Sequence, residues 1–152
     1  MDEQQGDYRW ESHADARVKF QIPTNWVTKE TEEKALAARS PDMAVGILFR
    51  YISLGAPEAV ADEKLVLSEL KSLVQDIKVT NPLTTFQQHG LTGTGLGGTG
   101  HRNGIPIGWF SIVFGDHHGH GVLAFGFGAA QEFVKQYPTI LKIMGSIQPI
   151  AN

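Results

Sequence analysis

The clearest alternation of apolar and polar positions lies near the start of the chain. In "RVKFQI", the apolar residues Val18, Phe20 and Ile22 are separated by polar ones, and this period of two is typical of a strand with one buried face. Two further strand-like segments, residues 35–40 and 43–51, flank the turn-forming letters "SPDM". They predict a β-hairpin.

A longer period appears in the middle and at the end of the chain. Residues 59–77 contain no glycine or proline, and their apolar positions recur at steps of three and four, which predicts an amphipathic helix. Residues 129–146 predict a second helix, and Pro138 inside it predicts a kink or a break near Tyr137. The apolar stripe of the first helix consists of Val66, Leu70, Leu73, Val74 and Ile77.

The glycine-rich run "GTGLGGTGHRNG", residues 93–104, contains two nucleotide-binding patterns that lack their context. Residues 93–98 match G-x-G-x-x-G, but the next segment is strand-like, whereas the motif needs a helix there to hold the pyrophosphate. The phosphate-loop pattern also nearly matches, but His101 and Arg102 stand where Lys and Ser or Thr are required. We therefore interpret residues 91–101 as a strand that has few side chains.

Asn103-Gly104 after that run predicts a two-residue hairpin turn, because both central positions of such a turn need positive φ. Folding the chain there places bulky residues opposite the glycines, and a second hairpin across residues 116–120 extends the sheet by one strand. The opposed pairs are Gly97 with Phe110, Gly95 with Ile112, Gly93 with Phe114, Gly115 with Gly121, Ile112 with Ala124, and Phe110 with Gly126. Such rows of small and large residues let a helix approach the sheet closely.

The other face of these strands is also apolar, so both faces of the sheet need cover. With two helices available, we expect an α+β fold: an antiparallel sheet covered by helices on both faces, an α/β/α sandwich. The length, 152 residues, favours one domain over 1–152, with residues 1–7 expected to be a flexible tail.

Composition excludes several classes of protein. The net charge is −3 without a basic stripe, so nucleic acid is not expected as a partner. The chain has no cysteine, which excludes disulfides and thiolate metal sites. No apolar run approaches a membrane span, and the polar start "MDEQQGDY" is not a signal peptide, although it is compatible with the trimmed start of an exported protein.

Several of these segments together resemble one known family. "VKFQIPTNW", a long helix, a glycine-containing strand, a hairpin and a final helix that ends in "ILKIMGSIQ" are similar to the PsbP-like superfamily over about residues 17–149. The superfamily includes photosystem extrinsic proteins, a Ran-binding nuclear-import factor and small bacterial exported proteins. The resemblance implies an α/β/α sandwich, an accessory role and a periplasmic or secreted location, and it carries no catalytic motif.

Candidate metal ligands cluster at one end of the predicted sheet. Imidazole and carboxylate groups bind zinc or copper, and the hairpin register places His89 opposite His118, close to Asp116 and His120. The competing interpretation is a solvated, histidine-rich hairpin tip, because tips tolerate polar residues and glycine. His101 belongs to the opposite end of the strand, about 30 Å away at about 3.3 Å per residue.

Two other features of the sequence bear on possible chemistry. Ser111 lies mid-strand in "WFSIVF" without the elbow that exposes a catalytic serine, so we interpret it as a buried strand residue. The aromatic residues are expected mainly in the core, with a few lining a ligand groove between sheet and helix. They are Tyr8, Trp10, Trp26, Tyr51 and Trp109.

The sequence thus favours a non-enzymatic binding or accessory domain, exported from a bacterium, whose partner is a protein or a small molecule and which needs no cofactor. Two alternatives stay open. One is a metal- or ligand-dependent protein or enzyme with its site at the histidine-rich hairpin, residues 116–120. The other is a self-associating module, for which a homodimer is one form.

Overall fold

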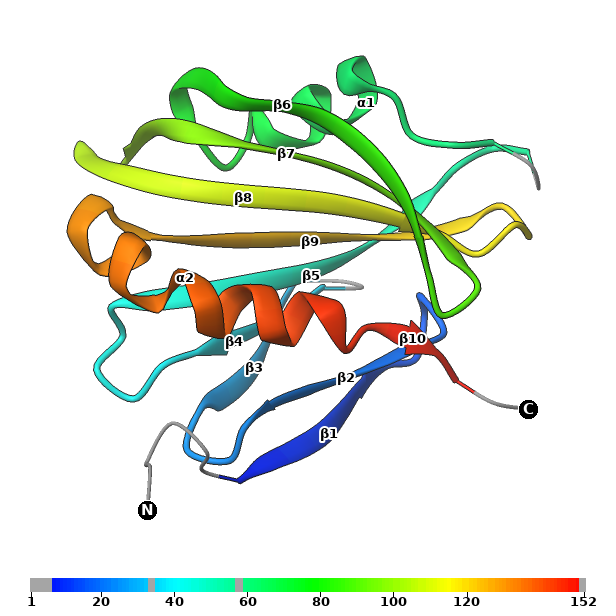
Figure 1. Ribbon diagram of the computed structural model, residues 1–152, viewed down its shortest axis with the longest axis horizontal. Coiled ribbons are helices and arrows are strands. Elements are labelled where there is room, and N and C mark those ends of the chain that lie inside the picture. The colour runs from blue at the N-terminus through cyan, green and yellow to red at the C-terminus, as the bar shows by residue number, and fades with distance from the viewer. Residues whose placement is uncertain (1–6, 33–34, 57–58, 151–152) are drawn as a thin grey trace.

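The computed structural model describes residues 7–32, 35–56 and 59–150, and its largest element is a seven-stranded antiparallel sheet (Figure 1). The strand order is β3-β4-β5-β9-β8-β7-β6. The antiparallel sheet that the pattern predicts is therefore confirmed. The strands are β3 (Val27–Glu32), β4 (Ala35–Arg39), β5 (Val45–Ser53), β6 (Gln75–Gln88), β7 (Leu91–Arg102), β8 (Ile105–Gly115) and β9 (His120–Ala129).

A smaller sheet and the long helix pack on one face of the large sheet. The small sheet consists of β1 (Tyr8–His13), β2 (Val18–Pro23) and β10 (Gln148–Pro149), and the helix is α2 (Ala130–Gly145). Figure 1 shows α2 lying across the front of the large sheet, with β1 and β2 below it. The core on this side includes Phe20, Ile22, Ile112, Phe114, Ala124, Ile140 and Ile143.

The register across the glycine strand agrees with the prediction. Asn103 and Gly104 both have positive φ, 53° and 78°, and they close the β7–β8 hairpin. Gly97 lies opposite Phe110, which in turn lies opposite Gly126, and the other predicted pairs also hold. The predicted strand and turn are thereby confirmed. The prediction was possible because the turn requires positive φ at two consecutive residues, and once the turn is placed, the register of the two strands is fixed.

The glycines make room for different neighbours on the two faces. A Cβ on Gly126 would stand 2.8 Å from Cγ2 of Ile140, so here α2 does approach the sheet closely, as the alternating rows predict. On the other face, a Cβ on Gly98 would overlap the carbonyl oxygen of Lys78, and one on Gly100 would overlap Val74. The missing side chains of β7 on that face therefore make room for the start of β6, not for a helix.

The first helix is much shorter than its apolar pattern suggests. Helix α1 spans Glu63–Leu70, and Asp62 caps it by accepting a hydrogen bond of 2.9 Å from the Leu65 amide. The predicted extent, residues 59–77, was wrong: the chain turns after Leu70, and Asp76 adopts a φ of 54°, which interrupts a right-handed helix.

The residues beyond α1 still bury apolar side chains in the same cluster. Val74, in the turn, and Ile77, on β6, join Val66 and Leu70 of the helix. The helical period therefore continued across a turn and into a strand, and periodicity alone could not detect the change of structure.

Helix α2 passes through Pro138 without a break. A proline removes the hydrogen bond to the carbonyl four residues earlier, that of Val134. Both residues are exposed, so that carbonyl lies on the side where water can satisfy it. Of the kink or break predicted near Tyr137, the break was therefore wrong, and the kink stays a prediction.

Strands β1, β3 and β6 were not predicted, because their exposed positions carry mainly polar residues and show little alternation. The predicted flexible tail covers residues 1–7, of which 1–6 lie outside the described residues. Asp7 is described, and its carbonyl oxygen accepts a hydrogen bond from the Thr24 amide. Neither of the two described helices is long and apolar enough to cross a membrane.

Candidate functional site

The histidine-rich hairpin between β8 and β9 is organised around Asp116. Its Oδ1 atom accepts hydrogen bonds from the backbone amides of His118, at 2.7 Å, and His120, at 3.1 Å. The Asp116 amide in turn donates to the carbonyl oxygen of His120, and His117 and Gly119 have positive φ in the turn. This carboxylate oxygen therefore holds the shape of the turn.

The histidines of this hairpin point to different neighbours. His120 Nδ1 lies 3.0 Å from the hydroxyl of Tyr51 on β5, and His117 Nε2 lies 3.0 Å from the hydroxyl of Thr92 on β7. His118 is exposed. Their contacts therefore spread over three places instead of converging on one point.

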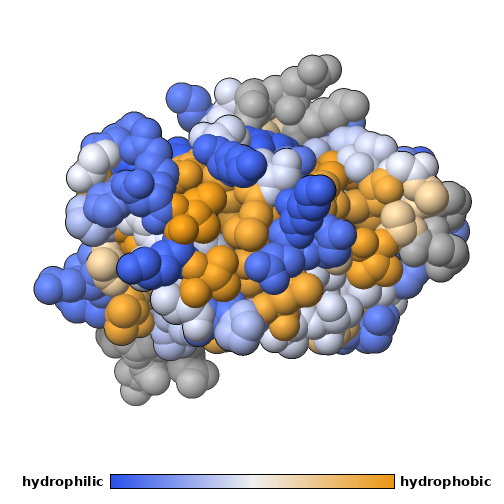
Figure 2. Space-filling model, turned by 90° about the horizontal axis from the view of Figure 1, so that it is seen from above, coloured by the Kyte–Doolittle hydropathy of each residue, from blue (hydrophilic) through white to orange (hydrophobic). Residues whose placement is uncertain are grey.

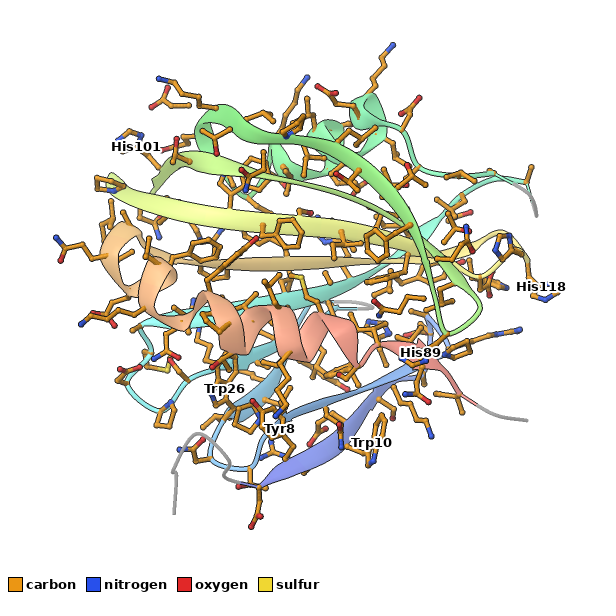
Figure 3. All side chains as sticks on the ribbon, in the orientation of Figure 1. Tyr8, Trp10, Trp26, His89, His101 and His118 are labelled. Carbon is orange, nitrogen blue, oxygen red and sulfur yellow. The ribbon has the colours of Figure 1, made fainter. Side chains whose placement is uncertain are left out.

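His89 lies in the turn between β6 and β7, with a φ of 50°. Figure 3 places His89 and His118 at the same end of the molecule and His101 at the other, next to Asp76 at 3.3 Å. Within residues 7–32, 35–56 and 59–150, no three histidine or acidic side chains gather as metal ligands would. The zinc or copper site at His89, Asp116, His118 and His120 stays a prediction.

A hollow of about 610 Å³ adjoins this end of the sheet. Asp116 and His118 line one side of it, and Ala14, Arg17 and the C-terminal segment around Ile150 line the other. The hollow is open to solvent. The carboxylate of Asp116, the imidazole of His118 and the guanidinium of Arg17 line it, and the structure shows no hydrogen bond among these three groups.

A second hollow, of about 450 Å³, lies between the β2–β3 turn, the β4–β5 turn and α2. Tyr8 and Trp26 line it together with Asp42 (Figure 3). Burial raises the pKa of Tyr8, and Lys142 Nζ lies 4.4 Å from the centre of its ring. Two residues of the aromatic set thus line a hollow beside α2, and its use as a ligand groove stays a prediction.

The other aromatic residues of that set lie elsewhere. Trp109 is a core residue with 1% of its surface exposed, whereas Trp10 is 48% exposed, with Lys19 Nζ 4.7 Å from its ring. Ser111 is fully buried, which confirms its interpretation as a strand residue. No helix directly follows the glycine run in β7, as the interpretation against a nucleotide loop requires.

A third hollow, of about 230 Å³, lies on the face of the sheet opposite α2, and we name it the arginine pocket. Its floor is apolar and includes Leu48 and Phe125, and Leu73 forms a wall. Arg39 and Arg102 reach it from the ends of β4 and β7. The remaining lining residues are Thr31, Ala37, Ala38, Gly46, Ile47 and Phe127.

Both arginines of the pocket lie against the ring of Phe127. The guanidinium carbons are 5.2 Å (Arg39) and 4.9 Å (Arg102) from the centre of that ring, within the range of a cation–π contact. Arg39, Gly46 and Phe127 are paired across β4, β5 and β9. Since Gly46 has no side chain, nothing separates the guanidinium of Arg39 from the ring.

The two guanidiniums are held by backbone carbonyls and not by carboxylates. Arg102 Nη1 donates to the carbonyl of Leu73 at 2.8 Å, and Arg39 Nη1 donates to that of Met43 at 3.4 Å. No carboxylate in the described part of the chain forms an ion pair with either of them. Burial, followed by the charge of Arg39, lowers the pKa of Arg102, so an anion placed here would stabilise both cations.

Sequence reasoning missed this pocket, because its residues come from six separate segments of the chain. Arg102 was considered only as a mismatch to the phosphate-loop pattern. A usable signal was present in the register of β4, β5 and β9, which aligns an arginine, a glycine and a phenylalanine in one row. That register requires a pairing of β5 with β9 that no local turn fixes.

Partly exposed apolar side chains also gather over α1 and β6, the elements at the top of Figure 1. Figure 2 shows this surface, with hydrophobic side chains in its middle and polar ones among and around them. The self-association hypothesis would draw on such a surface. The apolar side chains of these two elements include Leu65, Leu67, Ile77, Val79 and Leu83, and Leu73 lies in the turn between them.

Comparison with known proteins finds relatives in structure but not in sequence. No family model matches the chain, and no curated protein matches it significantly. The solved structure of cyanobacterial PsbP from Synechocystis is similar with a TM-score of 0.72 at 9% identity, over 95% of this chain and 93% of that one. LpqN of Mycobacterium tuberculosis, a protein described as involved in cell envelope biogenesis, has a TM-score of 0.62 at 12% identity, over 95% and 92%.

A protein from Bacteroides thetaiotaomicron is also similar, with a TM-score of 0.61 at 11% identity, over 95% of this chain and 48% of that one. These similarities show a PsbP-like fold. The resemblance that the sequence motifs indicate is thereby confirmed at the level of the fold.

Proposed function

We propose that this chain, which has a PsbP-like fold, is a non-enzymatic binding or accessory domain that acts outside the cytoplasm of a bacterium. The location rests on analogy with its structural neighbours, among which LpqN is described as involved in cell envelope biogenesis. The role rests on the arginine pocket of the chain itself.

The arginine pocket supports binding because of the groups that line it. Two guanidiniums and an apolar floor can hold an anion that has an apolar body. Apart from Arg39 and Arg102, the only polar side chain among the described lining residues is that of Thr31. None of these residues is a histidine, an acid or a lysine, the usual general acids and bases.

The histidine-rich hairpin gives further support to a binding role. Asp116 stabilises the turn through the amides of His118 and His120, and the ring of His120 contacts Tyr51. These contacts give Asp116 and His120 a structural role in the hairpin, which needs no catalytic function to explain it.

The proposal includes the three-layer form of the fold, with α1 and α2 on opposite faces of the sheet. Alternate residues of a strand point to opposite faces. On β8, Trp109 packs in the cluster that contains Val66 of α1, whereas Ile112 packs in the cluster that contains Ile140 of α2.

The experiment compares turnover and binding in the same protein. The wild type and the variant that combines His118→Ala with His120→Ala are incubated with ester, phosphoester and peptide substrates, with and without zinc. We expect equal background rates, while an NMR screen of anionic and neutral fragments on the wild type should find ligands that shift amides around the arginine pocket. Turnover by the wild type that the variant loses would contradict the proposal and favour the enzyme hypothesis.

The location is tested separately. The native gene with a C-terminal tag is expressed in its host, and the cells are fractionated by osmotic shock. Recovery of the protein with a periplasmic marker, or in the medium, is expected. Recovery with a cytoplasmic marker would contradict the export part of the proposal.

A further inference from the structure

The arginine pocket has features that select among possible ligands, and the inference drawn from them rests on the proposed binding function. We infer that the arginine pocket binds the carboxylate end of a medium-length aliphatic chain, a fatty-acid-like monocarboxylate. Three properties of the pocket favour this ligand: its charge, its apolar floor and its size.

The charge of the site calls for an anion. Each guanidinium carbon lies within 5.2 Å of the centre of the Phe127 ring, so the two are at most twice that distance apart. The charge of Arg39 contributes to lowering the pKa of Arg102, so the two cations repel each other, and no carboxylate of the described residues pairs with them. The planar carboxylate matches the planar fork of a guanidinium, and each arginine of the pair still has N–H groups free of its backbone contact.

The floor calls for an apolar body next to that anion. Phe125 and Phe127 stack with ring centres 5.1 Å apart, and Leu48 and Leu73 complete the surface. Aliphatic carbons placed on these side chains would be removed from water, which strengthens binding by about fourfold per buried methylene. An inorganic anion would leave the exposed parts of Phe127 and Leu73 in contact with water, whereas Phe125 and Leu48 are already buried by the protein.

The size of the hollow calls for a slender ligand. Its volume of about 230 Å³ is below the range of about 300–1,000 Å³ that is usual for drug-sized ligands. A single aliphatic chain with a carboxylate end fits this limit, whereas a nucleotide or a branched lipid headgroup exceeds it. Only the carboxylate and the first carbons of a longer chain would be buried.

The test is an isothermal titration with octanoate, below its critical micelle concentration, against octanol, octylammonium, acetate and octyl phosphate. We expect octanoate to bind at least tenfold more tightly than each of the other four. Equal binding of octanol would overturn the role of the arginines, and equal binding of acetate would overturn the role of the floor. Tighter binding of octyl phosphate would overturn the assignment to a carboxylate.

Variants then locate the binding. Arg39→Gln and Arg102→Gln should each weaken octanoate binding at least tenfold, and Arg102→Lys, which keeps the charge but loses the fork, should weaken it less than Arg102→Gln does. Arg50→Gln is the matched control, because Arg50 is an arginine on β5 whose guanidinium lies 3.6 Å from Glu69 and outside the pocket. It should leave the affinity within twofold of the wild type, and a greater loss in this folded control would overturn the location.

A measurement on the wild type keeps the inference testable if a variant fails to fold. In a ¹⁵N spectrum of the arginine Nε–H groups, octanoate should shift the signals of Arg39 and Arg102 and leave that of Arg50 in place. No binding of octanoate, with fragments of other chemistry still bound in the NMR screen, would overturn the ligand class while leaving the binding function intact. Octanoate binding that shifts only other arginines would overturn the assignment to this pocket.

Discussion

Gly126 offers a direct test of how closely α2 packs on the sheet. A Cβ added there would stand 2.8 Å from Cγ2 of Ile140 and 3.2 Å from Cε of Met144, whereas carbon atoms in contact prefer about 3.5–4.0 Å. Ile140 is fully buried and β-branched, so its Cγ2 cannot easily rotate away. We therefore expect Gly126→Ala to reduce the free energy of unfolding by about 1–2 kcal/mol, as overpacked cores do, even after the gain of about 0.5–1 kcal/mol from replacing a glycine in a strand.

The matched control is Gly145→Ala in the last turn of α2, where an added Cβ meets no atom within 4 Å. It should be neutral or stabilise the protein by up to about 1 kcal/mol, since alanine has the higher helix propensity. Urea unfolding followed by tryptophan fluorescence gives both free energies, and the melting temperature of Gly126→Ala should fall by roughly 2–8 °C. Equal stability of Gly126→Ala and the wild type would refute the close approach of α2.

Three further predictions concern the polar groups. Asp116→Ala should reduce the free energy of unfolding by about 1–2 kcal/mol, because its carboxylate accepts from the amides of His118 and His120; Asp116→Asn, which keeps an acceptor oxygen, should lose less in the same urea titration. The pKa of Asp42, followed by NMR, should lie below its ordinary value of 3.8, because the backbone amide two residues later and the hydroxyl of Ser40 donate to the carboxylate. The stabilisation from this lowered pKa is present above about pH 4 and is lost as the pH falls through the folded-state value, and Ser40→Ala should raise the pKa again. Saturating zinc or copper at pH 7.5 should leave the melting temperature unchanged, since the turn already uses the Asp116 carboxylate; a rise that disappears at pH 5.5 and in the variant combining His118→Ala with His120→Ala would instead support the metal site.

The part of the fold that the sequence predicted well depends on local rules. Asn103-Gly104 requires two consecutive residues with positive φ, and once that turn is set, the alternation of side chains fixes the register of β7 and β8. The same holds for the β8–β9 hairpin, so the opposition of Ile112 and Ala124 followed from the turn at its end.

The part of the fold that the sequence predicted poorly depends on contacts between distant segments. Val74 and Ile77 keep the helical spacing of Val66 and Leu70, yet they reach the same cluster from a turn and a strand. Residues 74–78 leave the helical path where β7 has no side chains: a Cβ on Gly98 would overlap the carbonyl oxygen of Lys78, and one on Gly100 would overlap Val74. A pattern confined to one segment carries no information about it.

The candidate functional residues show the same difference between features set by local turns and features set by contacts between distant segments. The hairpin register correctly placed His89 and His118 at one end of the molecule and His101 at the other, but it could not show that Asp116 is engaged by backbone amides. The arginine pocket depends on Arg39 and Phe127 facing each other across Gly46, which follows from the pairing of β5 with β9.

A crystal structure of the protein grown with octanoate tests the central claim most directly. We expect the carboxylate between the guanidiniums of Arg39 and Arg102, with the aliphatic chain against Phe127 and Leu48. Octanoate bound instead in the hollow of Tyr8, with both arginines of the pocket unchanged, would contradict it.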